Sequence, residues 1–356
     1  MTNRYKTITK IILSTLVLGF MALSPAKAQF GDIGAFLEAG ANDASILTRE
    51  YIKPFPTGFG TGLNAGFTES AAPKKLFGFS VQLRPSVAVV PSSDQSFDIS
   101  TLNLEKIRVA SGEDPVILEI FADPNDPNTK IGEFEMPGGT GFAFVPAPIV
   151  QASVGLIKKT DVTVRYLPET DISDFGSMSI LGGAVKHELT QYVPGGKLLP
   201  VDVSLMVGFN QIAVDANLDL QPDQNATRDP NDPALTSNPN PDFSTQEVTT
   251  TTNTFVVNAL VGKSLPFISV YGGIGYQKAD FELSMVGDYP VASFNPTTPQ
   301  DDYNVITDPF ALEIESESNI HMLGGFRLRL GILAIYGEAT LANYFTANAG
   351  VGISFR

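Results

Sequence analysis

The chain has 356 residues, of which 38 are acidic and 23 are basic, and it contains neither cysteine nor tryptophan. Without cysteine it has no disulfide scaffold, no thiolate nucleophile, no zinc site with cysteine ligands and no acylated lipoprotein anchor. The net charge of -15 argues against a nucleic-acid partner, because phosphate binding needs Lys and Arg clustered on one face. No cofactor is expected from any motif in the chain.

Residues 1–28 have the pattern of a secretory signal peptide. A basic start is followed by an apolar run from Ile11 to Leu23 and by Ala26-Lys27-Ala28. The run, of about 13 residues, is shorter than the roughly 20 that a spanning helix needs, which favours cleavage after Ala28 over a single membrane anchor. We therefore expect an exported protein whose mature chain begins at Gln29.

The segment 29–57 is expected to be partly helical. Its N-cap would be Asn42, one face would carry Ala44, Leu47 and Tyr51, and Pro54 would end the helix. An amphipathic helix of this kind could lie in the periplasm or act as a plug in the mouth of a barrel. The sequence leaves both alternatives open.

The last residues form the most regular strand pattern in the chain. From Phe345 to Arg356, apolar residues alternate with small polar ones, which predicts a strand with one apolar face. In an exported chain this stretch resembles the closing strand and assembly signal of outer-membrane β-barrels, which implies the barrel assembly machinery and the lipid bilayer as partners. It departs from that signal because the aromatic Phe355 is penultimate.

The same alternation predicts ten further strands. Inside the one at 201–218 the apolar face changes phase after Gln211, which indicates a β-bulge. Many of these strands exceed the about five or six residues usual in globular proteins and suit the roughly 9 to 11 that cross a bilayer. No mature segment approaches about 18 consecutive apolar residues, which excludes spanning helices. The predicted ranges are 59–68, 77–84, 150–156, 161–166, 175–192, 201–218, 249–263, 266–286, 314–329 and 332–342.

The expected fold class is an all-β transmembrane antiparallel barrel, formed by residues 58–356. Eleven strands are predicted, whereas single-chain bacterial barrels have even numbers, so we expect about 12, within a range of about 10 to 14. The missing strand could lie in 92–147, where Val116 to Phe121 is strand-like, or the parity could be repaired in 29–57.

The connections predict an orientation. Tight turns occur at Lys158-Lys159, Ser264-Leu265 and Leu330-Gly331. Long acidic segments rich in Pro, Asn and Thr occupy 92–147, 220–248 and 287–313. Outer-membrane barrels have short periplasmic turns and long outer loops. The three long segments should therefore share the outer side, in the outer membrane of a Gram-negative cell.

A family resemblance rests on three stretches: PTGFGTGLNAGF at 56–67, QASVGLIKKTDVTVRYLP at 151–168 and GAVKHELTQYVP at 183–194. Together they resemble an uncharacterised family of exported barrel proteins from Bacteroidetes, a domain of unknown function. In layout, the chain is also distantly similar to the long-chain fatty-acid outer-membrane transporter family. This second likeness is one of architecture, so no substrate residue can be carried over.

Charged side chains on the predicted inner face suggest a constriction in the lumen. If Leu330-Gly331 is a two-residue turn, Arg327 lies opposite Ala334, and Glu338 lies diagonal to His321. The alternative is that inner charges neutralise one another and fill a closed barrel. The candidate residues are Arg84, Arg165, His321, Arg327, Arg329 and Glu338.

Two further kinds of site were considered. The pentad Asp-Pro-Asn-Asp-Pro occurs twice, at Asp123 and Asp126 and again at Asp229 and Asp232, and its oxygens would suit calcium. Surface turns are favoured, because the EF-hand spacing is absent, and no other metal site is expected. A barrel-wall lipid hydrolase would use His187 or His321, but the chain has no G-x-S-x-G motif, so an enzyme is not expected.

The leading functional hypothesis is a porin-like channel or transporter for small molecules, hydrophobic ones included, whose solute the sequence does not identify. The alternative is a structural or interaction barrel that does not transport and whose acidic outer loops bind a partner. An outer-membrane lipid hydrolase is the weaker alternative.

Overall fold

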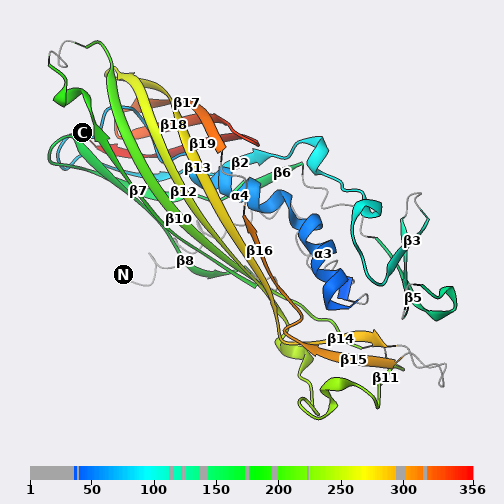
Figure 1. The fold of residues 1–356 in the computed structure, drawn as a ribbon. Helices are drawn as coiled ribbons and strands as arrows, with labels where there is room; N and C mark the ends of the chain where they lie inside the picture. Colours follow the sequence, from blue (N-terminus) through cyan, green and yellow to red (C-terminus); the bar gives the residue numbers. More distant parts are fainter. Residues whose placement is uncertain are drawn as a thin grey trace, which may run out of the picture.

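In the computed structural model, the chain forms an antiparallel β-barrel that is preceded in sequence by two helices (Figure 1). The structure describes residues 36–37, 40–111, 116–121, 123, 125–136, 143–172, 176–194, 199–222, 224–293, 302–315 and 319–355. The expected signal peptide therefore lies outside the described residues.

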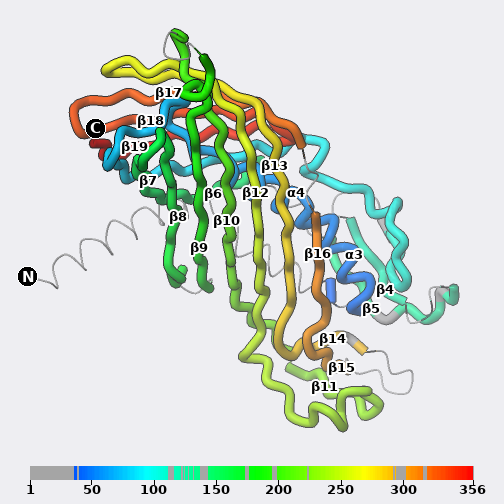
Figure 2. The backbone as a smooth tube through the Cα atoms, turned by 60° about the vertical axis from the view of Figure 1, so that its left-hand side comes forward, coloured from blue at the N-terminus to red at the C-terminus, as the bar shows by residue number. Residues whose placement is uncertain are grey.

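Among the described residues, ten strands close the barrel (Figure 2). Closure is made by β1, because Val81 lies opposite Ala152 of β7 on one side and Ile353 of β19 on the other. This confirms the predicted fold class, with a strand number at the lower end of the expected range. The strands are β1 (Phe79–Leu83), β7 (Val150–Leu156), β8 (Thr160–Asp171), β9 (Gly176–Glu188), β10 (Asp202–Asn217), β12 (Glu247–Ser264), β13 (Ile268–Val286), β17 (Asn319–Leu330), β18 (Leu333–Leu341) and β19 (Phe345–Phe355).

Three shorter strands extend the wall, two of them beyond breaks in β1 and β7. They are β2 (Ser86–Val89), β6 (Phe144–Ala147) and β16 (Ala311–Glu315). β2 pairs with β19 and β6, and β16 pairs with β13. Pro85 and Pro148 stand at these breaks, because proline has no N–H group to donate to a β-ladder.

The strand predicted at 59–68 is wrong, because residues 54–64 form helix α4 (Pro54–Asn64). Its alternating glycines produced the period of two, but they serve close packing. A Cβ atom on Gly58 would lie 2.5 Å from Val145 Cγ2, and one on Gly62 would lie 3.3 Å from Ala147 Cβ. Removing this stretch from the eleven leaves an even number, so no hidden strand is needed.

The strand-like run at 116–121 is β4 (Ile117–Phe121), but it does not belong to the barrel. It pairs with β3 (Ile107–Ser111) and β5 (Lys130–Glu135) in a separate sheet. A second small sheet joins β11 (Thr227–Arg228), β15 (Asp302–Thr307) and β14 (Asp288–Ser293). Both sheets are built from the long segments predicted as loops.

Helix α3 (Ala41–Ile52) lies within the segment predicted to be helical. The predicted N-cap is wrong: Asn42 lies inside the helix, and Gly40, at φ 87°, precedes it without a side-chain cap. Pro54 ends α3 and begins α4, since the first turn of a helix tolerates proline. In the described part of the chain, no helix is long and apolar enough to span a membrane.

The bulge predicted in β10 after Gln211 is also wrong. The pairing of β10 with β9 and β12 runs without a shift along the whole strand. Met206, Asn210 and Ile212 all lie on the buried face. What changes is the environment, because Ile212 packs with Leu63 of α4, so the inner face becomes apolar at this height.

The outward side chains divide the wall into an apolar belt and a polar part. On β13, exposed Ile268, Val270, Ile274 and Tyr276 are followed on the same face by Lys278, Asp280 and Glu282. The inner face changes in the opposite sense, because the polar Ser269 and Gln277 give way to buried Phe281 and Leu283. The length of 268–276 matches the roughly 9 to 11 residues that cross a bilayer. The belt is therefore the lipid-facing part of the barrel.

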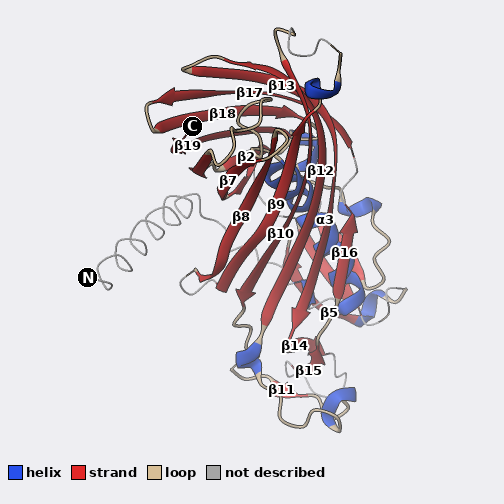
Figure 3. Cartoon of the chain, turned by 90° about the vertical axis from the view of Figure 1, so that its left-hand side faces the viewer, coloured by secondary structure: helices blue, strands red, loops and turns tan. Residues whose placement is uncertain are grey.

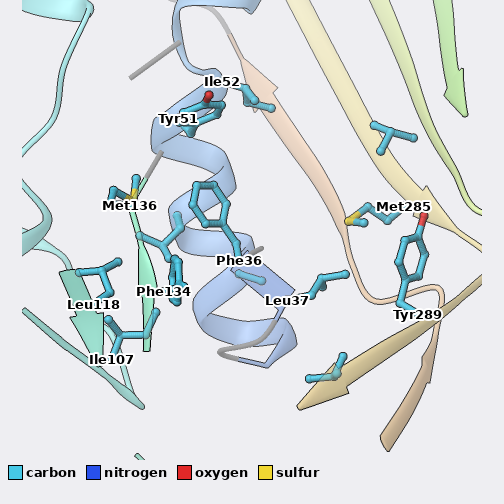
Figure 4. Close-up of a cluster of buried hydrophobic side chains, with 14 of the residues drawn as sticks. Phe36, Leu37, Tyr51, Ile52, Ile107, Leu118, Phe134, Met136, Met285 and Tyr289 are labelled. Atoms are coloured by element: carbon cyan, nitrogen blue, oxygen red, sulfur yellow. The ribbon is translucent and has the colours of Figure 1, made fainter. Parts of the chain in front are cut away.

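At the far side of the polar part, α3 and the two small sheets form a folded cap (Figures 1 and 3). Its apolar core joins side chains from the N-terminal segment, the β3–β4–β5 sheet and the cap-side end of β13 (Figure 4). Buried Asp43 of α3 accepts backbone hydrogen bonds from Glu105, Lys106 and Ile107, at 2.7–3.2 Å. Tight turns, among them Lys158-Lys159 and Gly331-Ile332, lie at the opposite end.

The belt predicts a depth-dependent effect of charge on the outer face of β13. Ile274→Arg should lower the free energy of unfolding in lipid vesicles by about 2–4 kcal/mol, because a charge would face hydrocarbon. Glu282→Arg, on the same face above the belt, should change it by less than about 1 kcal/mol. Urea titration of both variants measures this, and equal effects at the two positions would contradict the assignment of the belt.

Candidate functional site

The interior of the barrel is occupied by residues 54–78, which we call the plug. The plug consists of α4 and the irregular stretch that connects it to β1, and α4 contacts β2, β6, β10, β12 and β13. The irregular stretch ends beside β7, where Phe77 N–H donates to the carbonyl of Gly155 at 2.9 Å. The plug therefore runs from the cap, through the lumen, to the end with the tight turns.

Side chains of the barrel wall donate hydrogen bonds to the main chain of the plug. Ser86 binds the carbonyl of Gly62, and Ser204 binds that of Ala71, at 2.7 and 2.6 Å. The plug carbonyls between these two are bound by wall side chains that are longer than serine. These pairs are Arg165 with Leu63 and Ala65, Asn210 with Leu63, Gln151 with Gly66, Arg84 and Tyr271 with Thr68, and Lys186 with Ser70. The wall thus supplies donors along the length of the plug.

Arg165 is one of the fully buried donors, with no exposed surface. Its Nη2 donates to the carbonyl of Ala65 at 2.8 Å, and its Nε donates to Gln151 Oε1 at 2.9 Å. Its guanidinium also stacks on Phe67 of the plug, 3.4 Å from the ring centroid. A planar group with donors in a fixed fork can bind main-chain oxygens and an aromatic face together. Arg165 therefore holds the plug by both its main chain and a side chain.

Glu338 lies at the centre of a second group of contacts. Its Oε1 accepts from Gly66 N–H at 2.7 Å, and its Oε2 lies 2.7 Å from the Tyr271 hydroxyl, whose single O–H is shared with the carbonyl of Thr68 at 2.8 Å. Arg84 Nη2 lies 3.9 Å from Glu338 Oε2 and donates to Asn348 Oδ1 at 2.6 Å. Tyr271 can reach Glu338 because residue 325 is glycine, where a Cβ would lie 2.5 Å from the Tyr271 hydroxyl.

A third group of charges lies nearer the tight-turn end. Glu69 of the plug forms ion pairs with Lys74 and with Arg327, whose Nη1 lies 2.8 Å from Glu69 Oε1. On the wall, Lys186 Nζ lies 3.3 Å from Asp161 Oδ2, which also accepts from Lys74 N–H at 3.2 Å. Each of these buried charges therefore has an oppositely charged partner. A buried charge without such a partner would destabilise the fold.

Of the six predicted residues, the structure brings together Arg84 and Glu338, and Arg165 of β8 binds the same plug. Arg327 belongs to the third group. Arg329 lies apart, where its Nη2 donates to Pro266 carbonyl at 3.1 Å, and His321 Nε2 pairs with Asn258 Oδ1 at 2.8 Å. Whether any of them acts as a constriction stays a prediction.

The predicted pairing of β17 with β18 is wrong by two residues. The turn is Gly331-Ile332, with Gly331 at φ 69°, so Arg329 lies opposite Ala334 and Glu338 lies opposite Gly325. A shift of two residues leaves every side chain on its predicted face, since strands have a period of two. It does change the neighbours, so Glu338 meets Tyr271 and Arg84.

Sequence reasoning missed Glu69, Lys74, Asp161 and Lys186 as parts of the site. Asp161 and Lys186 could have been found, because they alternate in phase with other inward residues of β8 and β9. Glu69 and Lys74 lie in an irregular stretch of the plug, where no period indicates direction.

Asp123 and Asp126 of the first pentad are exposed at the surface of the cap, whereas Asp229 and Asp232 of the second are buried, with 8% and 5% of their surface exposed. Asp126 and Asp232 accept from the backbone N–H groups of Asn128 and Ala234 and cap short 3-10 helices. The Ser293 hydroxyl and the Asn231 N–H hold the pKa of Asp229 below its usual range. The described residues contain no group of three or more His, Asp or Glu that could hold a metal ion. Calcium binding has no support beyond the sequence pattern.

Neither histidine hydrogen-bonds a serine within the described residues. His187 Nδ1 lies 2.7 Å from Thr160 Oγ1, and its Nε2 lies 2.9 Å from the Tyr192 hydroxyl. The absence of a Ser-His pair gives the hydrolase hypothesis no structural support, and its rejection stays a prediction.

The chain belongs to a family of unknown function, DUF6588, whose sequence model matches residues 5–355. This confirms the predicted membership in an uncharacterised family. The Bacteroidetes source and the likeness to fatty-acid transporters stay predictions.

Comparison with curated proteins gives no match in sequence. Among solved structures, the chain is similar to the translocator domain of the autotransporter NalP from Neisseria meningitidis, with 9% identity, a TM-score of 0.29, and coverage of 90% of this chain and 99% of that one. The outer membrane transporter YddB from Escherichia coli is similar with 8% identity and a TM-score of 0.28, and the match covers 76% of this chain and 39% of that one. Ail, the attachment invasion locus protein of Yersinia pestis, is similar with 5% identity and a TM-score of 0.23, and the match covers 79% of this chain and 99% of that one. At these TM-scores the likenesses carry no functional argument.

The contacts of Arg165 predict a large and specific loss of stability. Arg165→Met should lower the free energy of unfolding by about 3 kcal/mol, because it leaves the carbonyls of Leu63 and Ala65 buried with fewer donors. Arg329→Met is the matched control, since its guanidinium binds at a rim, and it should cost less than about 1 kcal/mol. Denaturant titration in detergent measures both, and equal losses would contradict the role given to Arg165.

Proposed function

We propose that this protein is an outer-membrane barrel that is closed by its own plug and that binds a partner through its outer cap. The observation that carries the proposal is the row of wall donors on the plug main chain from Gly62 to Ala71. In this arrangement the barrel is an anchor and support, and the cap is the part that meets the surroundings.

Placement in the outer membrane is supported by three features. The barrel is closed, so no edge strand is left unpaired in lipid. Its belt exposes apolar side chains over the length that a bilayer requires. The three long segments gather at one end, which supports taking the cap as the outer end.

The filled lumen counts against the open form of the leading hypothesis, a channel or transporter for small molecules. Three of the side chains expected to form a constriction, Arg84, Arg165 and Glu338, form hydrogen bonds with the plug. A small solute would have to compete with a covalently attached segment that is held by many such bonds. The alternative of a barrel that does not transport therefore fits the geometry better.

A gated transporter is the second candidate, favoured by the polarity of the interface. Water or a polar solute can replace the charged and amide groups that bind the plug, which apolar packing would not allow. If the plug moved aside, the wall would expose Arg84, Arg165, Lys186, Asp161 and Glu338 to the lumen. Catalysis forms no part of the proposed function.

Planar-bilayer recording separates the two candidates. The purified full chain should show no steady ion current, because the plug fills the lumen. A double variant, Arg84→Met with Glu338→Leu, removes the acceptor for Gly66 N–H and one donor to the Thr68 carbonyl and should show transient openings. Arg329→Met should stay as closed as the natural chain. A steady current through the natural chain would overturn the closed-barrel proposal.

The cap should select partners by charge. The segments 92–147, 220–248 and 287–313 together hold twenty acidic and four basic residues, so they account for the negative charge of the whole chain. Opposite charges steer and stabilise encounters between surfaces, less so at high salt. We therefore expect the partner to present a basic surface.

A short Lys-rich peptide is a suitable probe of this surface. The natural chain should bind it, with an affinity that falls as salt rises. Asp98, Asp126 and Asp242 are N-caps, so changing all three to Asn keeps the capping oxygen and removes three charges. This triple variant should bind several-fold more weakly in calorimetric titration. Equal binding by the variant, or by a Glu-rich peptide, would contradict a charge-selective cap.

A further inference from the structure

The path of the chain before β1 has a direction across the barrel. Helix α3 packs in the cap, where Arg49 Nη1 donates to the carbonyl of Glu313 on β16 at 3.1 Å. The plug then descends through the lumen. At its end, Gly155 N–H donates to the carbonyl of Gly78 at 2.8 Å, close to the tight turn between β7 and β8.

Both ends of the barrel itself lie at the tight-turn end. Phe79, the first residue of β1, pairs with Phe355, the last of β19. An even number of strands requires this, because each hairpin returns the chain to its starting side. The plug is therefore an additional pass through the barrel, and it places α3 on the opposite side from both ends of the wall.

The wall accommodates the plug mainly as a main chain. Its donors bind carbonyl oxygens, which every residue type has, whereas the hydroxyl of Thr68 has no hydrogen-bond partner in the described structure. Inward glycines also leave room for it. A Cβ on Gly208 would lie 2.9 Å from the ring of Phe67, one on Gly262 would lie 3.0 Å from Ala71 Cβ, and one on Gly155 would meet the carbonyl oxygens of Lys74 and Lys75.

We propose that the barrel has a further function: it carries its own N-terminal segment across the membrane through the lumen and displays α3 at the outer surface. The wall supplies donors for the carbonyls of an irregular polypeptide, and its inward glycines leave space for it. The charged groups at Glu69 and Lys74 fix its register. The term outer rests on the membrane placement proposed above, whereas the passage through the lumen rests on the contacts alone.

The absence of cysteine makes the proposal directly testable. Three single variants place a thiol at exposed positions: Asn42→Cys on α3, Ser237→Cys in a long segment of the cap, and Ser264→Cys at a tight turn. Intact cells are treated with a membrane-impermeant maleimide, and permeabilised cells serve as the reference. Heat-modifiable migration on gels checks that each variant has a folded barrel.

We expect Asn42→Cys and Ser237→Cys to react to the same extent in intact cells, and Ser264→Cys to react at least tenfold less until the cells are permeabilised. Reaction of Asn42→Cys together with Ser264→Cys, and not with Ser237→Cys, would overturn the passage through the lumen. Reaction of Ser264→Cys alone in intact cells would mean that the membrane orientation is the opposite of the proposed one. The display of α3 at the outer surface would then be overturned, and α3 and the cap would still share one side.

Discussion

The structure depends on one constraint: a main chain buried inside a barrel must find hydrogen-bond partners outside itself. Helix α4 satisfies most of its own groups, but its last carbonyls, at Gly62 and Leu63, and the irregular stretch after Asn64 have no neighbouring strand. Arg165, Arg84, Tyr271 and other wall side chains take the place of that strand. A buried carbonyl without a partner would cost about 1–3 kcal/mol, so the donors and the plug are interdependent. The polar lining of the lumen follows from what occupies it.

The inner glycines have the same origin. A ten-stranded barrel is too wide for small side chains alone to fill and too narrow for a helix beside large ones. Glycine at positions such as 58 and 208 reduces the distance between plug and wall. The plug, the wall and the cap core around Phe36 and Tyr51 thus form one connected structure, in which α3 is tied to the barrel from both sides.

Period-two patterns predicted the barrel strands well, because a wall between lipid and a polar interior imposes strict alternation. The same rule placed Arg84, Arg165 and Glu338 on the inner face. It failed where another environment produced the pattern: alternating glycines in α4 imitated a strand, and the apolar inner face around Ile212 imitated a bulge. Partners such as Glu69 and Lys74 depend on the path of an irregular segment, which no local period encodes.

The long part of β13 between the belt and the cap also determines where binding can take place. Between Tyr276 at the edge of the belt and Val286 at the cap, the strand continues for ten residues, roughly 30 Å along its length at about 3.3 Å per residue. These residues act as a rigid spacer, stiffened by pairing with β12 and β16. The cap therefore stands clear of the lipid headgroups. A partner much larger than the barrel could approach it from the side without touching the membrane.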